Sequence, residues 1–338
     1  MNIIVDAFGG DNAPLEIMKG SVDAKNEFGV DITLVGNEEI IKNVAKENEI
    51  DLTGITIVHA DSVISQNEAG TVVVKGKKDS SMAVGMKMLH DGLGDAFVSA
   101  GNSGAVCVGA TLIVKRIKGI KRPAFAPVIP TLEGSMMLID CGANVECKPQ
   151  MLMQFGVMGS IYMEKVMGIK NPRVGLANVG TEPHKGGELQ LKTYELLENS
   201  KLNFVGNIEG RDVPVGGCDV CVSDGFTGNL ILKTFEGVAE ALMSKIKGVF
   251  SKNIKTKLAG AMVYFDLKEM KKSIDYNEFG GAPIIGCCKP VFKAHGSAKA
   301  KTFKNAIRLT KEYVENNVVE EISSALKLYN EGDTVSND

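Results

Sequence analysis

The 338-residue sequence contains no tryptophan, and aromatic residues make up only 6% of it. Proteins that bind single-stranded nucleic acid stack bases on aromatic side chains, so this scarcity argues against such a platform. The formal net charge is −3 at pH 7, so the chain has no overall positive charge that would attract a nucleic acid backbone. We therefore expect no nucleic acid partner.

Long hydrophobic runs are also absent, since no segment approaches the roughly 18 consecutive apolar residues that cross a bilayer. The N-terminal residues 1–6 resemble a strand with an acidic end and lack the order of a signal peptide. The seven cysteines are scattered and odd in number, which favours free thiols in a reducing compartment. These absences predict a cytoplasmic protein that can still contact a membrane surface.

The common motifs of nucleotide, metal and hydrolase chemistry are missing as well. The chain has no GxxxxGK[ST] loop, no GxGxxG after a strand, no HExxH and no GxSxG, which argues against several enzyme classes. Cys218 and Cys221 form a CxxC, but valines frame them in a predicted strand and no second pair follows. Buried cysteines are therefore a simpler interpretation than zinc or redox chemistry. We expect no metal and no cofactor.

Short β-branched runs alternate with amphipathic stretches along most of the chain. Such runs are typical of strands buried on both faces of a parallel sheet, and their alternation with helices predicts right-handed crossovers. The expected fold class is α/β, doubly wound with three layers. The predicted strands are 3–5, 32–35, 55–58, 96–99, 136–139, 174–177, 204–205 and 220–223, and the predicted helices are 13–28, 38–48, 80–91, 103–117, 149–167, 187–199, 227–250 and 297–328.

Two stretches interrupt this alternation. The prolines in and beside residues 125–131 predict edge strands or a crossing between subdomains, because proline cannot donate to a sheet ladder. Residues 251–281 are basic, then apolar, then basic, and we interpret them as a protruding helical hairpin inserted into the fold. We expect residues 1–330 to form one α/β body with internal subdomains, followed by a frayed tail at 331–338.

Glycine-rich polar turns carry the strongest chemical signal. Each of five predicted strands runs into such a turn just before a helix begins. In an open parallel sheet these junctions meet at the carboxyl ends of the strands, where ligands bind. Glycine permits close backbone approach, and free N–H groups with helix dipoles favour an anion. Together the turns predict a crevice that holds phosphate, at residues 6–14, 99–104, 140–144, 178–182 and 223–229.

The four histidines divide into two groups. His59 ends a strand and His90 ends a helix, so we interpret both as structural. His184 and His295 lie among glycines and lysines, which makes them candidates for a functional role, His295 the stronger of the two.

Several segments together resemble one family, the bacterial phosphate acyltransferases of phospholipid synthesis, also called acyl-carrier-protein:phosphate transacylases. No single segment is specific, but their order along nearly the whole chain is. The resembling segments are 5–11, 80–82, 98–102, 140–145, 170–175, 209–211, 224–229, 279–283 and 293–296.

This resemblance implies a fold similar to isocitrate and isopropylmalate dehydrogenases and to phosphotransacetylase. It also implies a homodimer, and a reaction in which acyl-carrier protein and inorganic phosphate give acyl-phosphate and free carrier. The product would feed a membrane glycerol-3-phosphate acyltransferase. Phosphate is already an anionic nucleophile at pH 7 and a thiolate leaves readily, so neither a covalent nucleophile nor a strong base is required.

We assign roles to individual residues on this basis. Holding the reactants together and stabilising the oxyanion remain as the tasks of the protein. The catalytic candidates are Asn229, Lys293 and His295, and the phosphate-binding candidates are Gly9, Gly10, Gly101, Asn102, Ser103 and Lys185. The orienting candidates are Asp6, Asp11, Asp140, Asn144, Asp224 and Lys233, where each aspartate has a helix N-cap as its structural alternative.

Two basic stretches suggest surfaces for partners. From Phe235 to Phe250 apolar residues follow helical spacing, and an apolar tip flanked by lysines comes next, which suits shallow insertion into an anionic membrane. A hairpin packed at a dimer interface is the alternative. The membrane-contact candidates are Lys255, Lys257, Leu258, Ala259, Ala261 and Met262. A second basic run at 115–122 is either a solvated face or a dock for the acidic acyl-carrier protein.

Three rival functions remain open at this stage. An acetyl-type phosphotransacylase would share the fold and differ in using coenzyme A as the acyl carrier. An isopropylmalate-type dehydrogenase would need a dinucleotide and a metal. A non-catalytic membrane scaffold for lipid synthesis would not require five ligand-facing turns.

Overall fold

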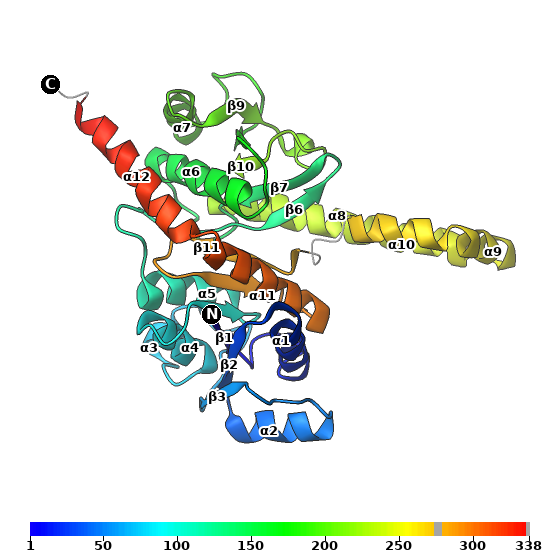
Figure 1. Ribbon diagram of the computed structural model, residues 1–338. Helices are drawn as coiled ribbons and strands as arrows, with labels where there is room; N and C mark the ends of the chain where they lie inside the picture. Colours follow the sequence, from blue (N-terminus) through cyan, green and yellow to red (C-terminus); the bar gives the residue numbers. More distant parts are fainter. Residues whose placement is uncertain (274–278, 336–338) are drawn as a thin grey trace.

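The computed structural model describes the backbone of residues 1–273 and 279–335 and the side chains of residues 1–270 and 279–327. Two sheets lie one above the other, each with its own helices (Figure 1). Residues 274–278 of the predicted insertion and residues 336–338 of the predicted tail lie outside this description.

The first sheet contains seven strands within the described residues, in the order β3-β2-β1-β4-β12-β11-β5. Its first five members are parallel, whereas β11 runs antiparallel to both of its neighbours. The strands are β1 Asn2–Asp6, β2 Asp31–Gly36, β3 Thr56–His59, β4 Ala96–Ser99, β5 Ala124–Phe125, β11 Gly281–Ile285 and β12 Val291–Ala294.

The second sheet contains five strands within the described residues, in the order β6-β7-β10-β8-β9. Only β6, at the edge, is antiparallel. As the prolines predict, β5 and β6 are edge strands of different sheets, so the chain crosses from one sheet to the other between them. The strands are β6 Val128–Thr131, β7 Gly134–Ile139, β8 Arg173–Ala177, β9 Asn203–Ile208 and β10 Val220–Val222.

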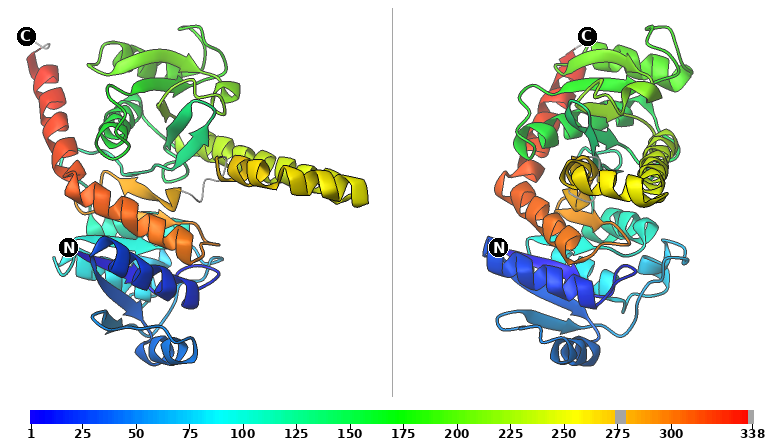
Figure 2. Two further views of the ribbon diagram at one scale, coloured as in Figure 1. Left: turned by 45° about the vertical axis from the view of Figure 1, so that its right-hand side comes forward. Right: turned by 90° about the vertical axis from the view of Figure 1, so that its right-hand side faces the viewer.

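Helices cover both faces of each sheet, which gives the three layers that the buried strand pattern predicts (Figures 1 and 2). In β1, Ile3 packs into the core beneath α1 and α11, while Ile4 packs into a second cluster beneath α4 and α5. The helices of the body are α1 Leu15–Phe28, α2 Glu38–Glu47, α3 Val72–Lys75, α4 Ser81–His90, α5 Ser103–Gly109, α6 Pro149–Lys165, α7 Glu188–Glu198, α11 Ala300–Glu315 and α12 Val318–Val335, with the short helices η1 Ala110–Val114 and η2 Gly210–Asp212.

One core cluster links the two sheets. It contains Ile3 and Val98 of the first sheet and Met137 and Val174 of the second, all fully buried. The last two helices continue this link, because α11 packs on α1 and α12 packs on α6 (Figure 1). The relative position of the sheets is therefore held by apolar packing as well as by the chain crossing.

Two predicted helices need correction, and two strands were missed. The predicted helix 297–328 is two helices, because Asn317 has a positive φ of 50° and the chain bends between α11 and α12. The predicted helix 103–117 is shorter, since α5 passes into η1 and the helical stretch ends at Val114. The strands β11 and β12 were not predicted at all, although β12 lies directly beside β4.

A long hairpin projects from the body (Figures 1 and 2). It consists of α8 Gly225–Ser251, whose first turns pack on the second sheet, followed by α9 Ile254–Met262 and α10 Tyr264–Ser273. A groove about 1040 Å³ in volume lies between α8 and the returning helices, with Phe250 and Tyr264 among its lining residues. Within the described residues, none of the helices is both long enough and apolar enough to cross a membrane.

Candidate functional site

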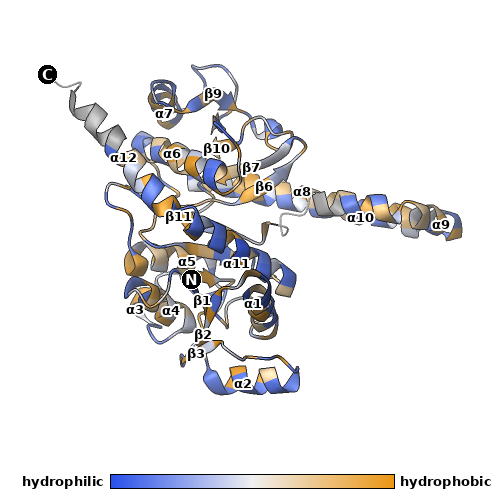
Figure 3. Ribbon diagram, viewed as in Figure 1, coloured by the Kyte–Doolittle hydropathy of each residue, from blue (hydrophilic) through white to orange (hydrophobic). Residues whose placement is uncertain are grey.

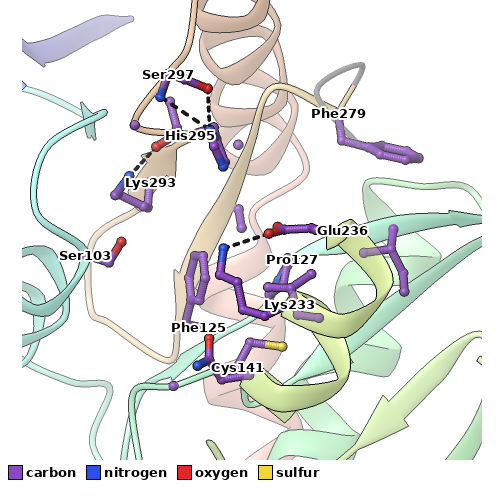
Figure 4. A pocket seen from close by; sticks show the side chains of 18 of the residues that line it. Ser103, Phe125, Pro127, Cys141, Lys233, Glu236, Phe279, Lys293, His295 and Ser297 are labelled. Atoms are coloured by element: carbon purple, nitrogen blue, oxygen red, sulfur yellow. Dashed lines mark hydrogen bonds and ion pairs between the residues drawn. The ribbon is translucent and has the colours of Figure 1, made fainter. Parts of the chain in front are cut away.

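A cavity of about 470 Å³ opens between the two sheets. Four of the five predicted glycine-rich turns contribute to its lining, through Asp11, Ser103, Gly142 and Asn229 among others. The remaining turn, at 178–182, borders a separate cavity of about 190 Å³. Figure 4 shows Lys293 and His295 entering from β12 on one side and Lys233 and Glu236 from α8 on the other.

Lys293 is the most deeply buried cation of the cavity, with a relative exposure of 6%. Its ammonium group donates hydrogen bonds to the carbonyl oxygens of Ala100 and Ala294. Burial lowers its pKa from 10.5 to about 8, while the nearby Asp11 and Asp6 act in the opposite direction. Lys293 is therefore mostly cationic at pH 7 and loses its proton within a unit or so above that.

His295 follows two residues later, just past the end of β12. Its Nδ1 lies 2.8 Å from the Ser297 hydroxyl and accepts from the Ser297 backbone N–H at 3.3 Å. Since Nδ1 accepts, this geometry assigns the hydrogen of the neutral ring to Nε2. Burial lowers the pKa of His295, with Lys293 and Lys233 adding to the effect. A neutral imidazole that donates through Nε2 is a suitable partner for a developing oxyanion.

The first turns of α8 form the opposite wall. Asn229, Leu232, Lys233 and Glu236 recur at helical spacing and all line the cavity. The Lys233 ammonium is 2.7 Å from the Glu236 carboxylate. Gly142, in the turn after β7, has a φ of 114°, a conformation that favours glycine. A β-carbon built there would lie 3.7 Å from the Asn229 side chain, which is an ordinary van der Waals distance.

Most of the predicted orienting carboxylates hold the framework and do not face the cavity. Asp6 is buried and accepts hydrogen bonds from the hydroxyls of Ser81, at 2.6 Å, and Ser99, at 2.7 Å. Burial raises its pKa, against the effect of these hydrogen bonds. Asp224 is the N-cap of α8 and accepts from the Thr227 backbone and hydroxyl, which is the structural alternative stated for it.

Asp140 ties the crossing segment to the turn after β7. It is fully buried and accepts from the backbone N–H groups of Phe125, Ala143 and Asn144 and from the Asn144 amide. Burial raises its pKa to about 6, although these hydrogen bonds favour the ionised form. The Asn144 amide also donates to the Pro123 carbonyl at 2.8 Å, so Asn144 belongs to the same clasp.

The predicted phosphate-binding residues are placed unequally. Ser103 lines the cavity, whereas Gly9, Gly10, Gly101 and Asn102 do not. A β-carbon on Gly9 would lie 2.6 Å from the Gly101 nitrogen, so these glycines let two turns pack together behind the cavity wall. The Asn102 side chain caps α5 and donates to three carbonyls of residues 65–68.

Lys185 is not a lining residue of this cavity. It lies 4.0 Å from Glu182, beside the separate turn after β8. His184 belongs to the same turn and is also absent from the lining, so the predicted role of this segment finds no geometric support. Its strand, β8, lies on the other side of β10 from β7 in the second sheet.

An apolar wall completes the cavity, and sequence reasoning missed most of it. Phe125, Pro127 and Phe279 are among the lining residues (Figure 4). Leu232 also lines the cavity. Phe279 stands at the start of a segment that carries the family resemblance, and Phe125 stands in the proline-rich crossing. The resemblance and the proline-rich stretch were both visible in the sequence, but neither shows the direction in which a side chain points.

Two cysteines also line the cavity, Cys107 of α5 and Cys141 after β7. Burial raises the pKa of Cys107 to about 12 and raises that of Cys141 as well. Both thiols therefore remain protonated at neutral pH, which makes them poor nucleophiles.

Comparison with known proteins gives consistent results. A family model described as "Fatty acid synthesis protein" matches residues 1–321. The phosphate acyltransferase of Thermoanaerobacterium thermosaccharolyticum is 48% identical over 336 residues, which cover 99% of both chains. A phosphotransacetylase structure from Streptococcus pyogenes has a TM-score of 0.60 at 16% identity, covering 93% of this chain and 94% of the other. A branched-chain phosphotransacylase structure from Enterococcus faecalis has a TM-score of 0.57 at 13% identity, covering 93% and 99%. At such identities the structures show similarity of fold.

Proposed function

Given that this chain belongs to the phosphate acyltransferase family, we propose that it transfers a fatty acyl group from acyl-carrier protein to inorganic phosphate. The products are acyl-phosphate and free carrier. The observation that carries the proposal is the composition of one cavity, which joins a buried ammonium group and a neutral histidine to an apolar wall. An anionic nucleophile and the acyl end of a thioester require these two surroundings side by side.

The transfer proceeds without a covalent enzyme intermediate. A phosphate oxygen attacks the thioester carbonyl carbon, the carbonyl oxygen becomes an oxyanion, and the carbon–sulfur bond then breaks. The pair of electrons leaves on sulfur as a thiolate. The two cavity thiols do not compete as nucleophiles, because burial keeps Cys107 and Cys141 protonated.

Lys293 protonates the leaving thiolate in this proposal. A thiol has a reference pKa of about 8.5, and burial brings the pKa of Lys293 to about 8. The proton therefore moves between groups of nearly equal pKa, with little change in free energy. Before that step the same ammonium attracts phosphate into the cavity, and Ser103 supplies a hydroxyl on the same side.

His295 and Asn229 stabilise the oxyanion. The Nε2–H of His295 and the amide of Asn229 are neutral donors from opposite walls of the cavity, and one well-placed donor contributes roughly 3–4 kcal/mol. Glu236 holds Lys233 at 2.7 Å, which keeps this second cation from reaching across the cavity until phosphate arrives to compete for it. Phe125, Leu232 and Phe279 cover the first part of the acyl chain.

One assay tests the reaction and its main rival together. Purified protein is incubated with phosphate and either palmitoyl-acyl-carrier protein or acetyl-coenzyme A, and acyl-phosphate is trapped with hydroxylamine. We expect product from the carrier-bound palmitoyl group. Product from acetyl-coenzyme A alone would instead identify an acetyl-type phosphotransacylase, and product from neither would remove the proposal.

The hairpin tip supports a further part of this proposal, a contact with an anionic membrane from the cytoplasmic side. Leu258 and Met262 of α9 are 63% and 79% exposed, and Phe265 of α10 is 78% exposed. Figure 3 shows hydrophobic and hydrophilic residues mixed along this end of the hairpin. Lys255 and Lys257 are exposed beside the apolar residues, as Ala261 is, whereas Ala259 is half-buried. Each near-surface lysine is worth about 1 kcal/mol on an anionic bilayer.

Such a contact would bring the enzyme to the next step of lipid synthesis. The acyl-phosphate product is an anhydride with a long apolar chain, so release beside the bilayer favours its use by a membrane glycerol-3-phosphate acyltransferase.

We also propose a homodimer. It would cover the apolar face of α8, where Leu230, Val238 and Leu242 are each more than half exposed. Light scattering after gel filtration would show a monomer if this part is wrong.

A further inference from the structure

The basic run between η1 and β5 has no assigned role. Lys115, Arg116, Lys118, Lys121 and Arg122, here called the basic segment, are all exposed. The surrounding residues 103–132 contain no aspartate or glutamate. Within the part of the chain that the structure describes, none of the five forms an ion pair. Five positive charges are therefore gathered on one surface without internal neutralisation.

The basic segment is held in a defined conformation. Ile117 and Ile120 point into the core and are 4% and 2% exposed, while Lys118 between them and the basic residues on either side are exposed. The buried side chain of Gln154, on α6, accepts from the Lys121 backbone N–H at 2.8 Å and donates to the Gly119 carbonyl at 3.0 Å. A partner that binds this surface would lose little free energy in ordering it.

A second cavity lies beside the basic segment and shares a lining residue with the reaction cavity. It measures about 180 Å³, and its lining includes Arg122 and Leu112. Cys107 lines both this cavity and the one between the sheets. The turn after β7 separates them, with Gly142 facing the reaction cavity and Ala143 facing the smaller one. The smaller cavity therefore adjoins the basic segment through Arg122 and the wall of the reaction cavity through Cys107.

We propose that the basic segment is the surface on which acyl-carrier protein docks, with its thioester arm passing by way of the smaller cavity. This inference rests on the proposed function. The partner is an acidic protein whose acyl group hangs from a long, narrow and flexible arm. Its carboxylates would face the five cations, and Leu112, which is 59% exposed beside Arg122, would supply an apolar contact among the charges.

The composition of the surface favours a protein over a membrane as the occupant. Shallow insertion into lipid needs several exposed apolar side chains, and the hairpin tip supplies these with Leu258, Met262 and Phe265. Among residues 111–122, Leu112 is the one large apolar residue that is exposed. A charged rim around a small apolar centre is the usual composition of a protein interface.

Charge reversal at two positions tests the docking surface. In the double variant Lys118→Glu/Lys121→Glu the buried isoleucines and the backbone contacts of Gln154 are untouched. We expect the KM for palmitoyl-acyl-carrier protein to rise about tenfold and the carrier affinity, measured by titration calorimetry, to fall by a similar factor. Binding by the unaltered protein should weaken as salt rises, because exposed charges are screened.

Two controls make the result specific. The matched variant Lys46→Glu/Lys201→Glu changes the net charge equally on exposed residues near α2 and β9, at opposite ends of the molecule (Figure 1). It should bind the carrier normally. The palmitoyl thioester of pantetheine, which lacks the carrier protein, should be used equally by the unaltered protein and the docking variant.

Other results would contradict the docking surface, its occupant or the proposed function. Unchanged carrier affinity in the docking variant refutes the inference, and so does an equal loss with both thioester donors. Loss of binding to anionic vesicles in this variant, with normal carrier affinity, would show a membrane surface instead. If the unaltered protein makes no acyl-phosphate from either donor, the proposed function fails, while calorimetry with the carrier still decides the docking surface.

Discussion

The cavity between the sheets and the projecting hairpin differ in how far their lysines and apolar residues are exposed to solvent. In the cavity, Lys293 is 6% exposed and burial shifts its pKa, whereas the lysines of the hairpin tip remain in solvent. Apolar side chains show the same reversal, since the core is closed around Phe292 while Met262 is 79% exposed. Burying a cation destabilises the fold, so a buried lysine indicates a role in chemistry. A group of exposed apolar residues indicates contact with a partner or a membrane.

The largest effect should come from removing the buried charge. We expect Lys293→Met to lower kcat for acyl-phosphate formation by at least about 10³-fold, because phosphate and the leaving thiolate both lose their cation. Stability should not fall. Below pH 8 the lowered pKa of Lys293 costs about 3 kcal/mol of folding free energy, and methionine removes this cost.

Urea unfolding with an activity assay separates these two effects. Lys289→Met, a change at a half-buried lysine outside the cavity lining, serves as the control and should keep its activity. A Lys293→Met protein that retains half of the normal kcat would show that the cation has no part in the transfer.

The pH dependence should be the next largest effect. Because Lys293 acts in its cationic form and its pKa is about 8, kcat/KM should fall about tenfold per unit above pH 8. The stability change has the opposite sign: the unfolded chain binds more protons between pH 8 and 10.5, so the unfolding free energy contributed by this group rises there. In Lys293→Arg the charge persists, and any remaining activity should lose the alkaline decline. A decline at the same pH in that variant would assign it to another group.

At the hairpin the expected effect is on location and not on rate. Leu258→Glu/Met262→Glu places two negative charges on the exposed tip and should reduce binding to anionic vesicles at least tenfold, as measured by co-sedimentation. Activity on soluble substrates should stay within twofold, because α9 is far from the cavity (Figure 2). The variant Leu132→Glu, at an exposed apolar residue elsewhere, should bind vesicles normally.

The smallest effect concerns Lys185. The fourth glycine-rich turn borders a separate cavity, so Lys185→Ala should change neither kcat nor the KM for phosphate by more than about twofold. Steady-state kinetics at several phosphate concentrations would detect a larger change. A tenfold rise in the KM for phosphate would show that Lys185 takes part in phosphate binding after all.

Local sequence pattern was sufficient for the parallel framework. The apolar runs of β1, β2, β4 and β7 lie where predicted, because strands buried on both faces are mostly apolar. Four of the five predicted glycine-rich turns contribute residues to the lining of one cavity. The pattern failed for β11 and β12, which contain one glycine, one proline and one lysine. They are strands because they pair with other strands of the first sheet.

The sequence by itself determined most of the parallel strands, the turns that carry glycine and the choice of Lys293 and His295 as candidates. The tertiary structure alone decided that β12 inserts beside β4, that α8 turns Asn229 and Glu236 toward the same cavity, and that burial shifts the pKa of Lys293. Hydrogen-bonding and steric preferences act over a few neighbouring residues and are legible in a chain. Burial and charge depend on residues brought together from nearly 200 positions apart, such as Ala100 and Lys293.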